Sequence, residues 1–263
     1  MGSASRAALE AAKSALASAK GVTRGTGEQL LSAGRDIAGS SQLRALLADP
    51  SVPVDEKTGL IGSIFSSLDP VAADLLGGLV GSRWSNSEQL IDGIEQVGIR
   101  AIAISAPDDA DIERELFAFS RAVSSDPELE LAVGSKLGDP AGKASLVDSL
   151  LKGKADDGTL AIVRHLVQTP RGRRIGELLT LAAETVAEAS GGVVANVTAA
   201  APLTAAQLDT LAATLKDQYG RDPRIAVKVD PSVIGGLRVQ VGDEVIDGTI
   251  ASRLTELRLQ LAG

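Results

Sequence analysis

The sequence lacks cysteine entirely and is poor in aromatic residues. Without cysteine it can form no disulfide, no thiolate nucleophile and no cysteine-type zinc site, and this usage favours an intracellular protein. Three Phe, one Trp and one Tyr among 263 residues are too few for a surface that stacks bases or sugars. The core must therefore be built from Leu, Ile, Val and Ala.

Positive charge and long apolar runs are also scarce. The chain has 26 Lys and Arg against 34 Asp and Glu, so its net charge of −8 gives no general attraction for nucleic acid. The most apolar stretch, residues 58–82, is interrupted by Pro70 and by Gly77-Gly78, which predicts two buried helices rather than a membrane helix. The first residues do not form the apolar segment of a secretory signal. We expect no nucleic-acid partner and no direct membrane insertion.

Helical periodicity dominates the chain up to about residue 190. Apolar residues recur three or four apart in short amphipathic segments, including residues 3–19, 28–38, 42–48, 71–80 and 87–104. Several of these positions recur at the same spacing later in the chain: Leu43, Lys57, Leu60, Ile61, Ile64 and Phe65 are matched by Leu129, Lys143, Leu146, Val147, Leu150 and Leu151. The match predicts a duplicated helical bundle, with chance alignment of leucine-rich helices as the alternative.

Beyond residue 190 the pattern changes from helical to mixed. Residues 193–199, 225–229 and 237–241 alternate as strands, and a helix with a capping box at its start lies between the first two. Gly242-Asp243 has the composition of a hairpin turn, and the last residues carry a helical apolar stripe, Ile250, Leu254, Leu257 and Leu261. The predicted fold class is mainly α with a small α/β C-terminal domain. The predicted domains are a first bundle at 1–103, a second bundle at 104–190 and the α/β domain at 191–263.

Tests for catalytic and ligand-binding chemistry are mostly negative. Residues 138–144, GDPAGKA, are one residue short of a phosphate-binding loop and lack the hydroxyl that reaches magnesium. The only imidazole, His165, lies beside an apolar face, which favours a packed or partly exposed structural histidine over a catalytic one. Arg171, Arg173 and Arg174 could hold an anion or a partner carboxylate, but a solvated helix start is the simpler interpretation. We expect no catalytic residue, no cofactor and no metal.

Several motifs toward the C-terminus are shared with one known family. They are Asp230, Ile234-Gly235-Gly236-Leu237, Gly242-Asp243 and Ile246-Asp247-Gly248-Thr249, preceded by Ala199-Ala200-Ala201-Pro202-Leu203. They resemble the C-terminal signature of the delta subunits of F-type ATP synthases, called OSCP in mitochondria. The resemblance covers residues 104–263 well and the first 103 more weakly, and the doubled bundle looks like the long actinobacterial form. The structural signature is Asp230, Gly235, Gly236, Gly242, Asp247 and Gly248, and we expect Asp247 and Gly248 to supply turn geometry and amide capping.

The resemblance implies a mechanical function rather than an enzymatic one. In the family, the delta subunit is a peripheral-stalk (stator) linker that joins the alpha/beta catalytic head to the b-subunit stalk during proton-driven ATP synthesis. It implies a non-catalytic subunit, peripheral on the cytoplasmic side of the cell membrane. The implied partners are the N-terminal helices of the alpha subunits and the C-terminal end of the b subunit.

The candidate contact residues are apolar positions on the expected helices. For the alpha subunit they lie on the first and fifth helices of the first bundle: Leu9, Leu16, Leu75, Leu76 and Leu79. For the b subunit they are Ile250, Leu254, Leu257 and Leu261. Ordinary core packing is the alternative for both sets. The alternative function is an intracellular helical adaptor or small-ligand-binding protein unrelated to the synthase, and the latter would need a pocket of convergent polar groups.

Overall fold

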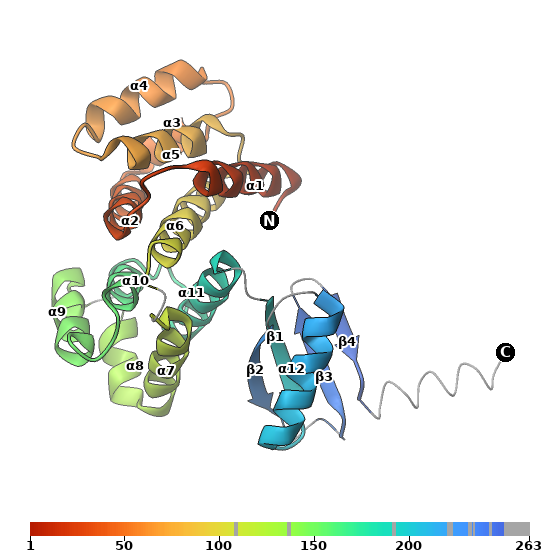
Figure 1. Cartoon of the computed structure of the whole chain (residues 1–263). Helices are drawn as coiled ribbons and strands as arrows, with labels where there is room; N and C mark the ends of the chain where they lie inside the picture. Colours follow the sequence, from red (N-terminus) through yellow and green to blue (C-terminus); the bar gives the residue numbers. More distant parts are fainter. Residues whose placement is uncertain are drawn as a thin grey trace. The chain divides into compact units, whose positions relative to one another are not determined.

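The computed structural model describes residues 1–107, 110–135, 138–190, 193–219, 223–230, 233, 235–241 and 244–249. The chain divides into two compact units, residues 1–186 and 187–263 (Figure 1). Eleven helices precede the first strand in the described part of the chain: α1 (Ser3–Ser18), α2 (Arg24–Gly39), α3 (Ser41–Ala48), α4 (Val54–Ile64), α5 (Pro70–Gly81), α6 (Ser87–Ile104), α7 (Ile112–Ser125), α8 (Pro127–Gly134), α9 (Pro140–Leu151), α10 (Asp157–Gln168) and α11 (Ile175–Ala189).

Side-chain caps set where most of these helices begin. The capping side chains accept hydrogen bonds from backbone N–H groups of the first turn, and they are Thr23, Ser40, Asp69, Asn86, Asp111, Asp126, Asp139 and Asp156. Asp69 together with Pro70 divides the apolar stretch 58–82 into α4 and α5, as the sequence predicts. Among the described residues, no helix is both long enough and apolar enough to span a bilayer.

The core of the first bundle is aliphatic, with Trp84 as its one buried aromatic ring. Leu30, Ile37, Leu76 and Ile94 are among its fully buried side chains. Helices α2 and α6 approach closely where two glycines face each other: a Cβ added to Gly27 would lie 2.6 Å from the carbonyl oxygen of Gly98. This close crossing makes α6 the central helix of the bundle.

One local contact of helices α2 and α5 recurs between helices α7 and α10. The backbone N–H of Asp69, the N-cap of α5, donates to Gln29 on α2 over 2.8 Å. The backbone N–H of Asp156, the N-cap of α10, donates to Glu115 on α7 over 2.9 Å. Residues 29 and 115 are 86 positions apart, the spacing of the expected repeat, and residues 69 and 156 are 87 apart, which fits the same repeat with one inserted residue. The similarity therefore extends from sequence spacing to hydrogen bonding.

The matched lysines of the two bundles are both buried. Lys57 lies on α4 and Lys143 on α9, and both side chains are almost fully shielded from solvent. Lys143 Nζ donates to the carbonyl oxygen of Ser135, the C-cap residue of α8, where a cation also complements the helix dipole. The lysine of the GDPAGKA stretch is therefore engaged by a backbone carbonyl of the same chain.

Helix α6 belongs to the contacts of both bundles. It packs against α1, α2, α3 and α5 and also touches α10 (Figure 1). Nearly every position from Leu90 to Ala103 is buried, including the charged residues Glu95 and Arg100. A helix buried on all sides must satisfy its charged groups inside the protein, and those groups define the site described below.

The second unit is a small α/β structure. Its elements are β1 (Val193–Ala199), α12 (Ala205–Tyr219), β2 (Pro223–Val229), β3 (Leu237–Val241) and β4 (Glu244–Asp247). The sheet order is β2-β1-β3-β4, with β1 and β2 parallel and the other two pairs antiparallel. Helix α12 provides the crossover that parallel neighbours require, and its Leu215 packs against Val197 and Val239. The fold class is that expected from the sequence; the turn at Gly242-Asp243 and the last helix lie outside the described residues.

Candidate functional site

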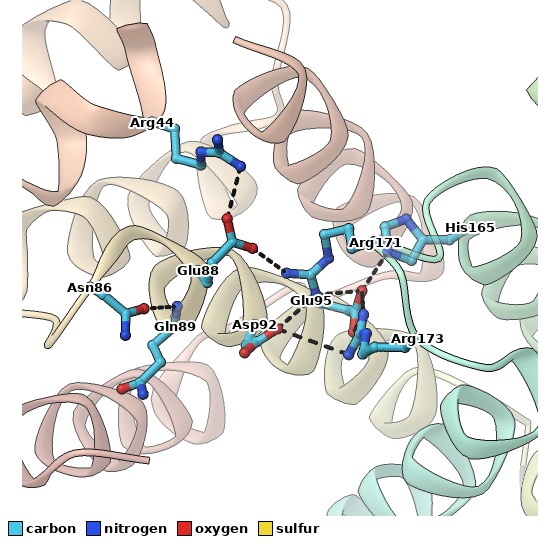
Figure 2. Close-up of polar contacts among 9 residues, drawn as sticks. All are labelled: Arg44, Asn86, Glu88, Gln89, Asp92, Glu95, His165, Arg171 and Arg173. Atoms are coloured by element: carbon cyan, nitrogen blue, oxygen red, sulfur yellow. Dashed lines mark hydrogen bonds and ion pairs between the residues drawn. The ribbon is translucent and has the colours of Figure 1, made fainter. Parts of the chain in front are cut away.

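A stripe of carboxylates runs along one face of α6. Glu88, Asp92 and Glu95 are spaced i, i+4 and i+7, so the three side chains project from one side of the helix. Asn86 fixes the start of the helix by accepting a hydrogen bond from the backbone N–H of Gln89 over 2.9 Å (Figure 2). The carboxylates meet the segment that connects α10 to α11.

Two arginines of that segment bind the stripe. Arg173 donates to both carboxylate oxygens of Glu95, over 2.9 and 3.0 Å. Arg171 donates to Asp92 over 2.7 Å and to Glu95 over 3.2 Å (Figure 2). Arg171 has a φ of 47°, the left-handed region that a non-glycine residue adopts only when its surroundings demand it. The backbone is thus held in an unfavourable conformation that brings both guanidinium groups to α6.

A buried histidine completes the cluster. His165 on α10 is 4% exposed, and its Nε2 lies 3.2 Å from Glu95 Oε2. Its Nδ1 lies 3.0 Å from an Nη atom of Arg35 on α2. A guanidinium can only donate, so Nδ1 accepts, and the neutral ring carries its proton on Nε2 and donates it to Glu95. The cluster therefore ties α2 and α6 to α10 and the α10–α11 segment.

Burial and the neighbouring charges set the protonation states of Glu95 and His165. Burial alone would raise the pKa of Glu95, but the hydrogen bond from His165 and the charges of Arg171 and Arg173 outweigh it and hold the pKa at about 2. Burial lowers the pKa of His165 below its ordinary value of 6.5, more than the neighbouring Glu95 raises it. At neutral pH the cluster thus contains an ionised glutamate and a neutral histidine.

The cluster is packed and holds no ligand-sized space. The cavity beside it measures about 10 Å³, room for one water molecule, and is bordered by Glu95, His165 and Arg171. No group of three or more metal-ligating side chains occurs among the described residues. What the arrangement does is connect α2 and α6 to α10 and the α10–α11 segment through buried hydrogen bonds and ion pairs.

The interpretation of the arginines as a solvated helix start is wrong for two of the three. Arg171 and Arg173 bind carboxylates of the chain itself, whereas Arg174 is exposed. The sequence analysis missed Glu95 and Asp92. The available signal was an acidic stripe at helical spacing on a helix that is otherwise apolar.

The leucines expected to contact an alpha subunit lie inside the first bundle. Helices α1 and α5 are neighbours, which brings the candidate residues together. All are buried in the same core: Leu9, Leu16, Leu75, Leu76 and Leu79. Contact of a partner with this set stays a prediction. The candidates for the b subunit, Ile250, Leu254, Leu257 and Leu261, lie outside the described residues.

The residues of the C-terminal signature form a tight junction in the second unit. Gly235 and Gly236 have φ values of 116° and 84°, and a Cβ on Gly236 would lie 2.4 Å from the carbonyl oxygen of Gly248. Asp247 accepts hydrogen bonds from the backbone N–H of Thr249 over 3.0 Å and from its hydroxyl over 2.7 Å. The backbone N–H of Asp230 donates to Ala199, which attaches the end of β2 to β1. Gly242 lies outside the described residues.

An open groove of about 640 Å³ lies next to this junction. Its lining is mostly apolar and comes from the start of α12 and from the ends of β1 and β3: Ala199, Ala200, Ala201, Pro202, Leu203, Ala206, Gln207, Thr210, Leu211, Thr214, Gly236 and Leu237. The described residues of this lining include no charged side chain, and an apolar lining of this kind suits the apolar face of a helix.

Comparison with known proteins gives one consistent result. Residues 100–261 match the family model described as ATP synthase delta (OSCP) subunit. The chain is 50% identical to the ATP synthase subunit delta of Leifsonia xyli, over the full length of both chains. It is 39% identical to that of Kineococcus radiotolerans, covering 98% of this chain and 96% of the relative. Among solved structures, it resembles a chain of the Toxoplasma gondii mitochondrial ATP synthase hexamer at 22% identity and a TM-score of 0.45, covering 64% of this chain and 95% of that one.

Proposed function

The chain belongs to the family of ATP synthase delta (OSCP) subunits, and we propose that it acts as a non-catalytic stator link between the alpha/beta head and the b-subunit stalk. It is a peripheral subunit of the synthase, which we place on the cytoplasmic side of the cell membrane. The family excludes the alternative expectation, an adaptor or small-ligand-binding protein unrelated to the synthase.

The buried ion cluster is the observation that best supports a mechanical role. A link that resists rotor torque must transmit force without bending between its parts. Glu95 receives hydrogen bonds from Arg171, Arg173 and His165, and with Arg35 on α2 these contacts join the first bundle to the second. Buried charge pairs tolerate little displacement, because each separation exposes an unpaired charge to a low-dielectric interior. The two bundles would thereby behave as one stiff arm.

We assign the two bundles, residues 1–103 and 104–190, to a duplication. The repeated hydrogen bonds of Asp69 with Gln29 and of Asp156 with Glu115 support it. Helix α6 then has two roles, as the last helix of the first copy and as a neighbour of α10 in the second. The third part, residues 191–263, is the separate α/β domain.

We assign the alpha-subunit contact to the surface of α1 and α5. Their leucines fill the core beneath this surface, so a partner helix would lie on the exposed residues above them. Gly78 is one such residue, exposed on α5 with no atom within 4 Å of an added Cβ. The absence of a side chain there lets another helix approach closely.

We assign the b-subunit contact to the second unit. The apolar groove beside α12 has the volume and lining for one face of a helix. The stripe Ile250, Leu254, Leu257 and Leu261 follows Thr249 directly in the sequence and would add to this surface. This keeps the head contact and the stalk contact on different units of the chain.

Calorimetric titration of the full chain with the N-terminal helix peptide of the alpha subunit tests the head contact. We expect saturable binding, lost in a Gly78→Trp variant whose added ring covers the α5 surface. The matched control is Gly62→Trp on α4, also an exposed helical glycine with open space around an added Cβ. Equal binding by both variants would contradict the α1/α5 assignment, and no binding by the folded wild-type chain would contradict the head contact itself.

A further inference from the structure

The second bundle carries a groove that the proposed head and stalk contacts do not use. It lies where α7, α8 and α11 meet and has a volume of about 480 Å³. Its lining is Ser120, Val123, Ser124, Glu130, Arg174, Gly176, Glu177, Thr180, Leu181 and Glu184. Figure 1 labels these three helices.

Small residues form the contact between α7 and α11 at this groove. The hydroxyl of Ser120 donates to the carbonyl oxygen of Gly176 over 3.5 Å, and Ser124 also lies against this glycine. Small side chains let the backbone of another helix approach closely. On the floor, Leu181 is 42% exposed, an apolar side chain that the described residues do not cover.

The described part of the groove's lining carries more negative than positive charge. Its charged residues are Glu130, Glu177, Glu184 and Arg174, and Glu184 also interacts with another group of the chain. Glu130 and Glu177 are exposed, and neither forms an ion pair with another residue in the described part of the chain. The excess of carboxylates around an exposed leucine favours a positively charged, partly apolar ligand.

The spacing on α11 points to a helix rather than a small molecule. Glu177, Leu181 and Glu184 are spaced i, i+4 and i+7, so they form a straight stripe about 10 Å long on one face. The carboxylates Glu88 and Glu95 on α6 have the same i, i+7 spacing, and there they hold Arg171 and Arg173. The chain thus already uses this arrangement of acids to bind two cations from another segment.

We propose that the groove between α7, α8 and α11 docks an amphipathic helix of a partner protein, one that presents Lys or Arg on either side of an apolar residue. The apolar residue packs on Leu181, and the cations meet Glu177 and Glu130. Such a contact would give the chain a further attachment point, and linked attachments strengthen each other through effective concentration.

The absence of cysteine allows a site-specific test in the full chain. A fluorophore attached to a Ser125→Cys variant, at the exposed last residue of α7 next to Ser124 of the lining, reports on the groove and leaves Leu181 in place. The same fluorophore on Ile64→Cys, at the exposed last residue of α4, is the control. The probe is a helical peptide of about 18 residues made of Ala, Leu and Lys, with the lysines flanking a leucine stripe. We expect a saturable signal change at position 125 and none at position 64. Equal changes at both positions, or an equal response to a peptide with Glu in place of Lys, would overturn the proposal.

Charge reversal separates docking from general attraction to an acidic protein. In the Glu130→Lys/Glu177→Lys variant the peptide should bind at least about tenfold more weakly. The matched control is Asp55→Lys/Glu56→Lys, which changes the net charge equally and also alters acids in the first turn of a helix. It should change the affinity by less than about twofold. Equal weakening by both variants overturns the groove assignment, and full displacement of the peptide by spermine at equal concentration overturns a helix as the occupant.

Discussion

His165 Nε2 and Glu95 Oε2 lie 3.2 Å apart although 70 residues separate them in the chain. Since Arg35 occupies the other ring nitrogen as a donor, the histidine is neutral and donates to an ionised carboxylate. This one hydrogen bond links α10 to α6. The stability of residues 1–186 should therefore depend on the charges around it.

Glu95→Leu should be strongly destabilising. It removes the acceptor that His165, Arg171 and Arg173 share and leaves the two guanidinium groups with only Asp92 and the exposed Glu88, at a cost of about 3–5 kcal/mol in the free energy of unfolding. The measurement is urea denaturation followed by circular dichroism. The matched control is Glu88→Leu on the same helix: Glu88 is exposed, so its pairs with Arg44 and Arg171 should contribute about 1 kcal/mol or less. Similar costs for both variants would mean that the cluster does not join the bundles.

Acid should weaken the fold through Glu95. Its pKa is about 2 in the folded protein against an ordinary 4.5, so its stabilising contribution is complete above pH 4.5 and is lost as the pH falls toward 2. Between about pH 6 and about pH 3 the loss from this group amounts to about 2 kcal/mol. Comparing the wild-type chain with Glu95→Gln isolates this contribution. Parallel pH profiles of the two proteins would refute the depressed pKa.

His165 should affect the stability of the fold at higher pH than Glu95 does. Its pKa is lowered in the folded protein, so the folded state binds fewer protons than the unfolded state once the pH drops below about 6.5. Stability should begin to fall there, and the slope should disappear in His165→Gln. Because this is the only histidine of the chain, thermal unfolding measured from about pH 7 to about pH 5 reports on it directly. A slope that persists in the variant must come from another group.

Gly236→Ala should lower the stability of the second unit by more than backbone strain alone would. A Cβ there would lie 2.4 Å from a carbonyl oxygen, in addition to the strain of a φ of 84°. Gly21→Ala is the control, since it has a φ of 77° but open space around the added atom. We expect about 1 kcal/mol for Gly21→Ala and clearly more for Gly236→Ala, both from chemical denaturation. Equal costs would show that the approach to Gly248 does not restrict this position.

Local signals carried most of the fold prediction. The apolar spacing of residues 87–104 predicts the helix that the structure contains as α6, and the Val-rich alternation predicts the strands. Gly77-Gly78 does not break α5, although it helped to argue against a membrane helix. Periodicity identifies such elements because each buries one face, a property that depends only on neighbouring residues.

The ion cluster could not be derived in the same way. An acidic residue on a helix is usually solvated, and the sequence does not show that Arg171 and Arg173 lie next to Glu95. Only the packing of α10 against α2 and α6 brings them together. His165 is an intermediate case, because its apolar neighbours predict a packed or partly exposed position, whereas the structure buries it against a carboxylate that the sequence does not indicate. Long-range polar pairing is thus the part of the site that sequence patterns leave open.

The stator assignment is tested most directly by asking whether the chain bridges head and stalk. Analytical ultracentrifugation of the isolated alpha/beta head and the soluble part of the b subunit, with and without the full chain, measures this. We predict that head and b subunit sediment together only when the chain is present. If the chain binds neither of them, or binds one and excludes the other, it is not the link between head and stalk.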